Sequence, residues 1–184
     1  MQETARTRLF ETAVDRYGFV TTEDATDLGI ATGELSKLAA RGRLRHVAYG
    51  IYRFPELPES AQDPYMLATL WAGPQSVLSH DTALALYELC DINPAKIHVA
   101  VPPGYRTRRK NAGAYVLHHE DIDPADIGWW EAIPAVRPAA AIRQASEGAV
   151  PAYLAHQAIS NGLDRGILRK HQAADLKGLL SRVS

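Results

Sequence analysis

Glycines divide the stretch from Gly18 to Phe54 into short segments, and this division constrains the fold more than any other feature of the sequence. Thr21 or Thr22 can cap a first helix that ends near Leu28, because a hydroxyl at that position accepts a backbone N–H that has no partner within the helix. Gly29 then supplies a tight turn. The stretch therefore begins with a short helix and an abrupt change of direction.

A second short helix is predicted from Thr32 to Gly42, where a residue in the left-handed conformation ends it at little cost. Its apolar positions recur at helical spacing and form a buried face, which comprises Leu35, Leu38 and Ala39. Its opposite face carries small and basic side chains, namely Gly33, Ser36, Lys37, Ala40 and Arg41. Two short helices around a tight turn are typical of a helix-turn-helix, and small side chains on the second helix allow it to approach base edges in the major groove.

Two strands are predicted after this helix, from Leu44 to Val47 and from Ile51 to Phe54, around a turn that contains Gly50. They would form the wing of a winged helix-turn-helix. No carboxylate lies between Lys37 and Arg53, so phosphate oxygens would meet positive charge along the whole segment. The candidate DNA contacts are Thr32, Gly33, Ser36, Lys37, Arg41, Arg43, Arg45, His46, Tyr49 and Arg53. The alternative interpretation is a small helical domain with a solvated basic face.

The global composition favours no partner, since the 184 residues carry a formal net charge of -1. The single cysteine, Cys90, excludes an intramolecular disulfide and any cysteine-rich zinc site. The sequence begins without an apolar signal core, and no stretch approaches the length of a membrane span. We therefore expect a cytoplasmic protein without membrane association.

The proline-rich segment at residues 55–60 predicts a linker and divides the chain into a winged helix-turn-helix domain (1–58) and a second domain (59–184). Three strands are expected in the second domain, within Lys96–Val101, Ala114–His118 and Glu131–Val136. Helices are expected after Asp63, Ser79 and Pro138 and around Leu176, Leu179 and Leu180. Another is expected within Pro151–Asn161, with Tyr153, Leu154, Ala158 and Ile159 facing inward. In the winged domain a first helix is expected at Glu3–Tyr17, with Val14 on its inner face. The predicted fold class is therefore mixed α/β (α+β), with a small sheet and several helices following the winged domain.

Two charged stretches stand out in the second domain. One is a basic loop with Arg106, Arg108, Arg109 and Lys110, which would add phosphate contacts or remain solvated. The other runs from Glu120 to Glu131, carries only negative charge and contains Trp129 and Trp130. This acidic stretch is either a solvated loop or a docking site for a basic partner.

The histidines do not predict catalysis or metal binding. His80 and Asp81 are adjacent on an expected helix, so their side chains point in different directions. His118 and His119 are adjacent on an expected strand, so they project to opposite faces and do not readily share one ion. We therefore assign no catalytic residue, metal or cofactor.

Several segments together resemble the AbiEi-like antitoxins, which are transcriptional regulators of type IV toxin–antitoxin systems. They are RGRLRHVAYGIYRFP from Arg41, SHDTALALYEL from Ser79, IHVAVP from Ile97 with RTRRK from Arg106, IPAVRPAAAIRQAS from Ile133, and QAISNGLDRGIL from Gln157. The resemblance covers nearly the whole chain. It implies an N-terminal winged helix that binds an operator, and a C-terminal α/β domain that counters a nucleotidyltransferase-like toxin.

The functional hypothesis is a DNA-binding autorepressor and antitoxin, not an enzyme. Its expected partners are double-stranded DNA of its own promoter, with inverted repeats, and a cognate nucleotidyltransferase toxin. The protein would be a monomer in solution or a dimer on DNA. One alternative is a repressor without a toxin partner. The other is a nuclease, although no expected strand combines the carboxylates and lysine that a metal nuclease commonly needs.

Overall fold

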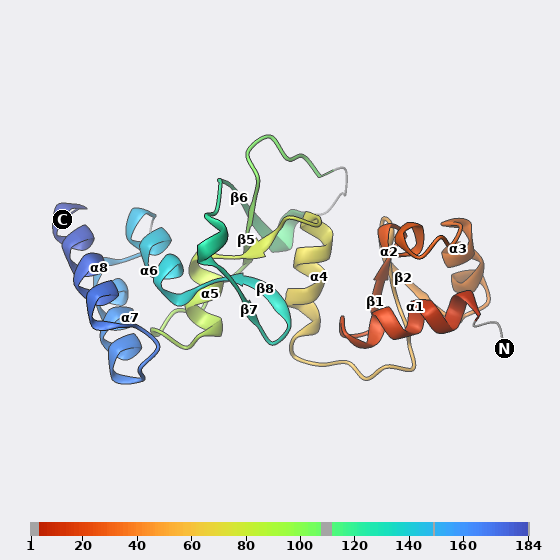
Figure 1. Ribbon diagram of the computed structural model, residues 1–184, viewed down its shortest axis with the longest axis horizontal. Coiled ribbons are helices and arrows are strands. Elements are labelled where there is room, and N and C mark those ends of the chain that lie inside the picture. Colours follow the sequence, from red (N-terminus) through yellow and green to blue (C-terminus); the bar gives the residue numbers. More distant parts are fainter. Residues whose placement is uncertain (1–3, 108–111, 149, 184) are drawn as a thin grey trace. The chain divides into compact units, whose positions relative to one another are not determined.

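A computed structural model of the protein describes residues 4–107, 112–148 and 150–183. They form a mixed α/β fold with a three-stranded and a five-stranded sheet (Figure 1). The chain divides into two compact units, unit 1 up to Trp71 and unit 2 from Ala72, with Thr107 grouped with unit 1. The domain boundary between residues 58 and 59 stays a prediction, since a compact unit need not coincide with a domain. Within the described ranges every helix is too short or too polar to cross a lipid bilayer.

Unit 1 contains the predicted helix-turn-helix and hairpin. Its elements are α1 (Ala5–Val14), β1 (Phe19–Thr21), α2 (Thr22–Asp27), α3 (Gly33–Ala40), β2 (Arg45–Ala48), β3 (Ile51–Arg53) and most of α4 (Asp63–Ala72). The strands are antiparallel in the order β1-β3-β2. Strand β1 was not predicted; it pairs with β3 and so anchors the wing to the helices.

Local hydrogen bonds explain where α2 begins and where the turn falls. Thr21 Oγ1 accepts the Asp24 backbone N–H at 3.1 Å, and Asp24 Oδ2 accepts the Thr21 backbone N–H at 2.7 Å. This reciprocal pair satisfies two N–H groups at the helix start. Gly29 then takes a φ of 67°, which permits the turn before α3. The predicted cap and turn are therefore confirmed.

The core of unit 1 forms where the buried faces of its helices meet the sheet. It consists of Leu9, Ala13, Val20, Ala25, Ile30, Leu35, Leu44, Tyr52 and Phe54. Leu38 and Ala39 pack partly buried against it. Val14, expected on the inner face of the first helix, is instead 54% exposed in the last turn of α1.

Unit 2 is built on the five-stranded sheet, in the order β6-β5-β4-β8-β7. Its strands are β4 (Val77–Leu78), β5 (Ile97–Val101), β6 (Tyr115–His119), β7 (Ile127–Trp130) and β8 (Ile133–Val136). Neighbouring strands run parallel in β5/β6 and β4/β8, and antiparallel in β4/β5 and β7/β8. β7 lies at one edge of the sheet. Neither β4 nor β7 was predicted, because β4 has only two residues and β7 lies in the acidic stretch.

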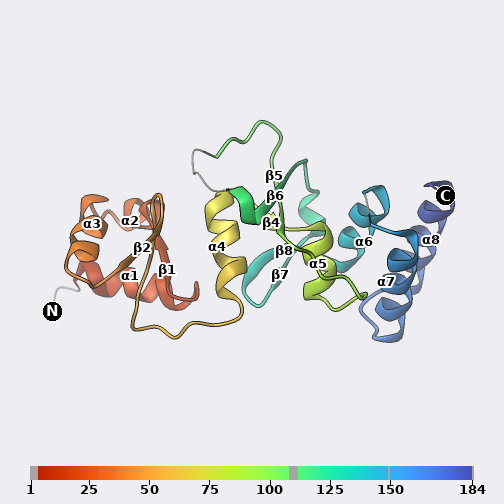
Figure 2. The same cartoon turned by 180° about the vertical axis from the view of Figure 1, so that it is seen from behind.

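The helices of unit 2 are α5 (His80–Leu86), α6 (Pro138–Glu147), α7 (Ala152–Asp164) and α8 (Lys170–Val183). Figures 1 and 2 show α6, α7 and α8 packed together, and α6 also contacts α5. Leu154, Ala158 and Ile159 are buried as predicted. Tyr153 was expected to point inward but is 70% exposed, because it lies on the opposite face of α7 from Ala155 and Ala158.

Candidate nucleic-acid interface

Helix α3 presents the residues that the sequence assigns to base contact. Leu35 is fully buried and fixes the rotation of the helix. As a result Gly33, Ser36 and Lys37 are exposed on the outer face. Thr32 occupies the N-cap position without a side-chain cap bond, and the residue is exposed. The outer face of α3 therefore offers small and hydroxyl-bearing groups that a nucleic acid could approach closely.

The wing is the β2–β3 hairpin, which turns at Tyr49 and Gly50. Gly50 has a φ of 69°, and a Cβ atom at this position would lie 2.8 Å from Thr22 Oγ1. The Gly50 carbonyl also accepts the Thr22 backbone N–H at 2.9 Å. This close contact joins the tip of the wing to the start of α2. Tyr49 beside it is 77% exposed, so the turn displays an aromatic ring to solvent.

A surface hollow of about 260 Å³ lies between α3 and the wing. It is lined by Thr22, Thr32, Gly33, Ser36, His46, Tyr49, Gly50 and Tyr52. Ser36 Oγ lies 3.3 Å from Tyr52 Oη, and the His46 ring lies 5.1 Å from the Tyr52 ring. The structure thus brings together five predicted contact residues from two elements, with hydroxyl and imidazole groups that can donate or accept hydrogen bonds.

The positive charge of this region is partly balanced by acids that lie outside the Lys37–Arg53 run. Lys37 Nζ lies 2.6 Å from Glu34 Oε1, and the hydrogen bond from Lys37, together with its charge, holds the pKa of Glu34 below its usual range. Arg45 Nη2 lies 2.9 Å from Glu59 Oε1. Both pairs are exposed, so their attraction is weak, and a phosphate could replace the carboxylate at little cost. Neither Arg41 nor Arg43 has an ion-pair partner among the residues described, and both are exposed.

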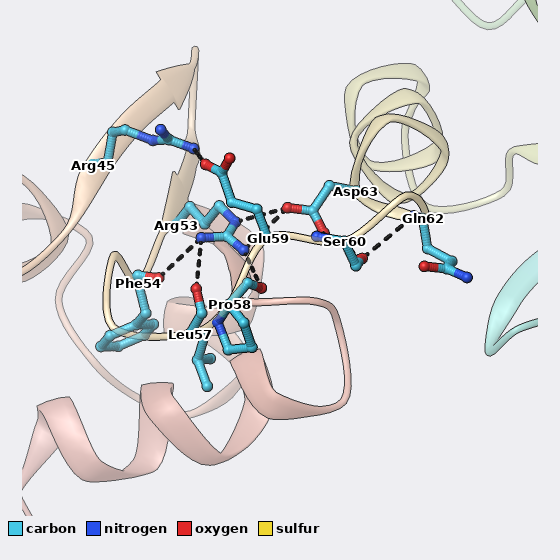
Figure 3. A network of polar contacts seen from close by, with 9 residues as sticks. All are labelled: Arg45, Arg53, Phe54, Leu57, Pro58, Glu59, Ser60, Gln62 and Asp63. Carbon is cyan, nitrogen blue, oxygen red and sulfur yellow. Dashed lines mark hydrogen bonds and ion pairs between the residues drawn. The ribbon is translucent and has the colours of Figure 1, made fainter.

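Arg53 does not fit its assignment to a phosphate contact. Its side chain is 2% exposed and lies 3.0 Å from Asp63 Oδ2 (Figure 3). It also donates to the backbone carbonyls of Phe54 at 3.3 Å, Leu57 at 3.0 Å and Pro58 at 2.7 Å. A guanidinium with all these partners inside the protein is not available to DNA, so Arg53 is a structural residue that holds the chain after β3.

Residues 8–55 match the family model described as "Transcriptional regulator, AbiEi antitoxin". The match covers most of α1 and all of the helix-turn-helix and wing, and it confirms the resemblance to AbiEi-type antitoxins over this segment. No curated protein matches the chain.

A crystal structure of the RV2827C protein from Mycobacterium tuberculosis is similar in fold. The two share 20% sequence identity with a TM-score of 0.52, and the similarity covers 100% of this chain and 78% of the other. At this identity the comparison supports the fold alone.

The second basic patch lies outside this AbiEi-type segment. Arg106 is exposed in unit 2. Arg108, Arg109 and Lys110 lie outside the described residues. The assignment of these four residues to phosphate contacts therefore stays a prediction.

Three histidines form a cluster in unit 2 that the sequence analysis did not anticipate. The rings of His80 and His118 stack with centroids 3.5 Å apart, and His118 Nε2 lies 3.1 Å from His98 Nδ1. Burial lowers the pKa of His80 to about 3, with a further contribution from His118 and His98. The ring is thus neutral near pH 7 and a weak base. Across the described ranges, no group of three or more histidine, cysteine or acidic residues is arranged to hold a metal ion.

Proposed function

We propose that the protein is a DNA-binding transcriptional repressor that acts on its own promoter, and that it also serves as the antitoxin of a type IV toxin–antitoxin system. The repressor role is supported by the hollow between α3 and the wing, which lies in the segment that matches the regulator family. A recognition helix with small side chains, beside an exposed wing and arginines, has the features of a major-groove reader.

The residues of this interface divide into two roles. Thr32, Gly33 and Ser36 lie at the start of α3, so we assign them with Lys37 to base edges and sugars. Arg41, Arg43 and Arg45 are exposed beyond the end of α3 and on β2, so we assign them to phosphates. Phosphate contacts hold the protein on any duplex, whereas base contacts select the operator.

The phosphate role is tested by fluorescence anisotropy with a promoter fragment over a range of salt concentrations. The double variant Arg41→Ala/Arg43→Ala should bind the operator and an unrelated duplex more weakly by similar factors. Its slope of log affinity against log salt should be shallower by about 2, because each phosphate contact contributes about 0.9. The matched control for the loss of two charges is Lys170→Ala/Lys177→Ala, which replaces two exposed lysines on α8. A double variant with the slope of the wild type would contradict the phosphate role.

The base-reading role is tested by Lys37→Ala in the same assay. Loss of a base contact should reduce operator affinity more than affinity for the unrelated duplex, by about 1–3 kcal/mol of discrimination. Glu34→Gln is the control, since it removes the partner of Lys37 and leaves the lysine itself free to bind DNA. Equal losses of affinity for the two duplexes would assign Lys37 to the phosphate contacts instead of the base contacts.

The antitoxin half of the proposal is supported by the family description of residues 8–55. We infer that the protein counters a nucleotidyltransferase-like toxin encoded beside it. Co-expression with that neighbour should restore growth that the neighbour alone arrests. If growth is not restored while operator binding is intact, the protein is a repressor without a toxin partner.

A further inference from the structure

Trp129 lies on β7, the edge strand of the five-stranded sheet in unit 2, and is 70% exposed. An indole in water forgoes the stabilisation that burial would give, and large aromatic side chains are enriched in protein interfaces. β7 pairs with β8 on one side, and in the described sheet no strand lies on its other side. An edge strand of this kind can accept an extended segment from another protein.

A hollow of about 400 Å³ lies beside Trp129. Its walls are mainly apolar and include Pro74, Val77, Ile122, Ile127 and Pro134. All of these residues belong to unit 2. The volume lies within the range of pockets that bind small molecules, so it is sufficient for the side chain of a partner.

Two carboxylates, Glu120 and Asp121, also line the hollow, and none of its described lining residues is a lysine, arginine or histidine. Gln144 Nε2 donates to Glu120 Oε1 at 3.0 Å and so fixes the position of this carboxylate. Burial raises the pKa of Glu120, the negative charge of Glu147 raises it further, and the positive charge of Arg143 lowers it in part. A cation bound in the hollow would stabilise the ionised carboxylates, whereas a phosphate would be repelled by them, so this surface does not suit nucleic acid.

Arginine combines the properties that this surface selects. Its planar guanidinium stacks on aromatic rings and binds carboxylates through two parallel hydrogen bonds. Lysine carries a compact, strongly hydrated charge that matches the aromatic wall less well. We propose that the hollow binds an arginine side chain on an extended segment of a partner protein, with the guanidinium between the Trp129 indole and the carboxylates of Glu120 and Asp121.

This proposal goes beyond the DNA-binding function and does not depend on it. It involves unit 2 alone and a partner of opposite charge to DNA. A failure of operator binding would leave it intact, and a failure of arginine binding would leave the operator assignment intact.

The test uses the full chain labelled with ¹⁵N and the blocked peptide acetyl-Thr-Val-Arg-Val-Thr-amide. The titration follows the indole N–H signal of Trp129, identified by its absence in Trp129→Phe. The arginine peptide should shift this signal, and the same peptide with citrulline, a neutral analogue of arginine, should bind at least about tenfold more weakly. Asp121→Asn should also weaken the arginine peptide, because it removes one carboxylate at an exposed position.

Trp129→Ala should reduce the affinity for the arginine peptide at least about tenfold, measured from backbone amide shifts. Tyr153→Ala is the matched control, since Tyr153 is also 70% exposed but lies on α7, and it should bind like the wild type. Equal affinity for the arginine and citrulline peptides would overturn the proposal. Wild-type affinity of Asp121→Asn for the arginine peptide would also overturn it. This variant provides the test if Trp129→Ala does not fold. A dimer of the free protein that Trp129→Ala dissociates would assign the surface to a second copy of the chain and also overturn it.

Discussion

Replacement of Arg53 by alanine should strongly destabilise unit 1. The change leaves the Asp63 carboxylate, whose side chain is 14% exposed, without its cation, and leaves three backbone carbonyls without the donor they have now. Removal of one partner from a buried ion pair typically costs about 3–5 kcal/mol of unfolding free energy. We expect Arg53→Ala to fall in this range. Arg53→Lys should cost less, because an ammonium keeps the charge but cannot reach all the acceptors of the planar guanidinium.

Urea unfolding followed by circular dichroism measures this cost, with two transitions fitted if the units unfold separately. Arg45→Ala is the matched control, because Arg45 and Glu59 form an exposed pair, with side chains 57% and 67% exposed. Such pairs contribute about 0–1 kcal/mol. The reasoning is refuted if Arg53→Ala costs no more than Arg45→Ala. It is also refuted if Arg53→Lys, still folded, changes the salt dependence of DNA binding, since that would place Arg53 on a phosphate.

Two further predictions concern the turn of the wing and the histidine cluster. Gly50→Ala should destabilise unit 1 by about 1–2 kcal/mol, measured by urea unfolding, because φ is 69° and the new Cβ would lie 2.8 Å from Thr22 Oγ1; a neutral result would show that the turn relaxes freely. The second concerns the pH dependence of the free energy of unfolding. Burial lowers the pKa of His80 from 6.5 to about 3. Below pH 6.5 the unfolded chain therefore binds a proton that the folded state accepts only near pH 3. The contribution of neutral His80 to the free energy of unfolding should be fully present above pH 6.5 and decrease towards pH 3. The decrease should be less than about 1.4 kcal/mol per pH unit, because the ring is partly solvated. His80→Asn, which tolerates the positive φ at this position, should reduce that slope, and an unchanged slope would contradict the assignment.

Features determined by short stretches of sequence were predicted well. The cap at Thr21, the turn at Gly29 and the hairpin at Gly50 each depend on a few adjacent residues, and all are found in the structure. The buried face of α3 follows from helical spacing and is equally local. The fold class and the exposed outer face of α3 could therefore be reached from the sequence.

Features determined by contacts between distant residues were not predicted. Arg53 was grouped with its basic neighbours, and its counterion lies ten positions later at the start of α4. All three residues of β3 are buried because β3 lies between β1 and β2, and this central position depends on pairing with β1, which was not predicted. The histidine cluster depends on the packing of α5 against the β5/β6 pair, which no local pattern encodes.

The edge strand β7 was missed for a related reason. Its residues lie among acidic and turn-forming residues, and a run of tryptophans in such surroundings does not alternate as a strand does. The strand forms because β8 offers it a partner across the turn at Glu131 and Ala132, both with positive φ. The hollow beside Trp129 therefore becomes visible only once the sheet order is known.

The contacts of Asp63 determine where the winged module can be cut from the rest of the chain. Asp63 Oδ2 accepts from Arg53, while Oδ1 accepts the backbone N–H of Ser60 and its hydroxyl, so one carboxylate links the end of β3 to the first turn of α4. A fragment that stops within residues 55–60 would retain Arg53 without its counterion. Such a truncation would report a defect of folding in place of the affinity of an isolated DNA-binding module. A fragment for operator binding has to include α4.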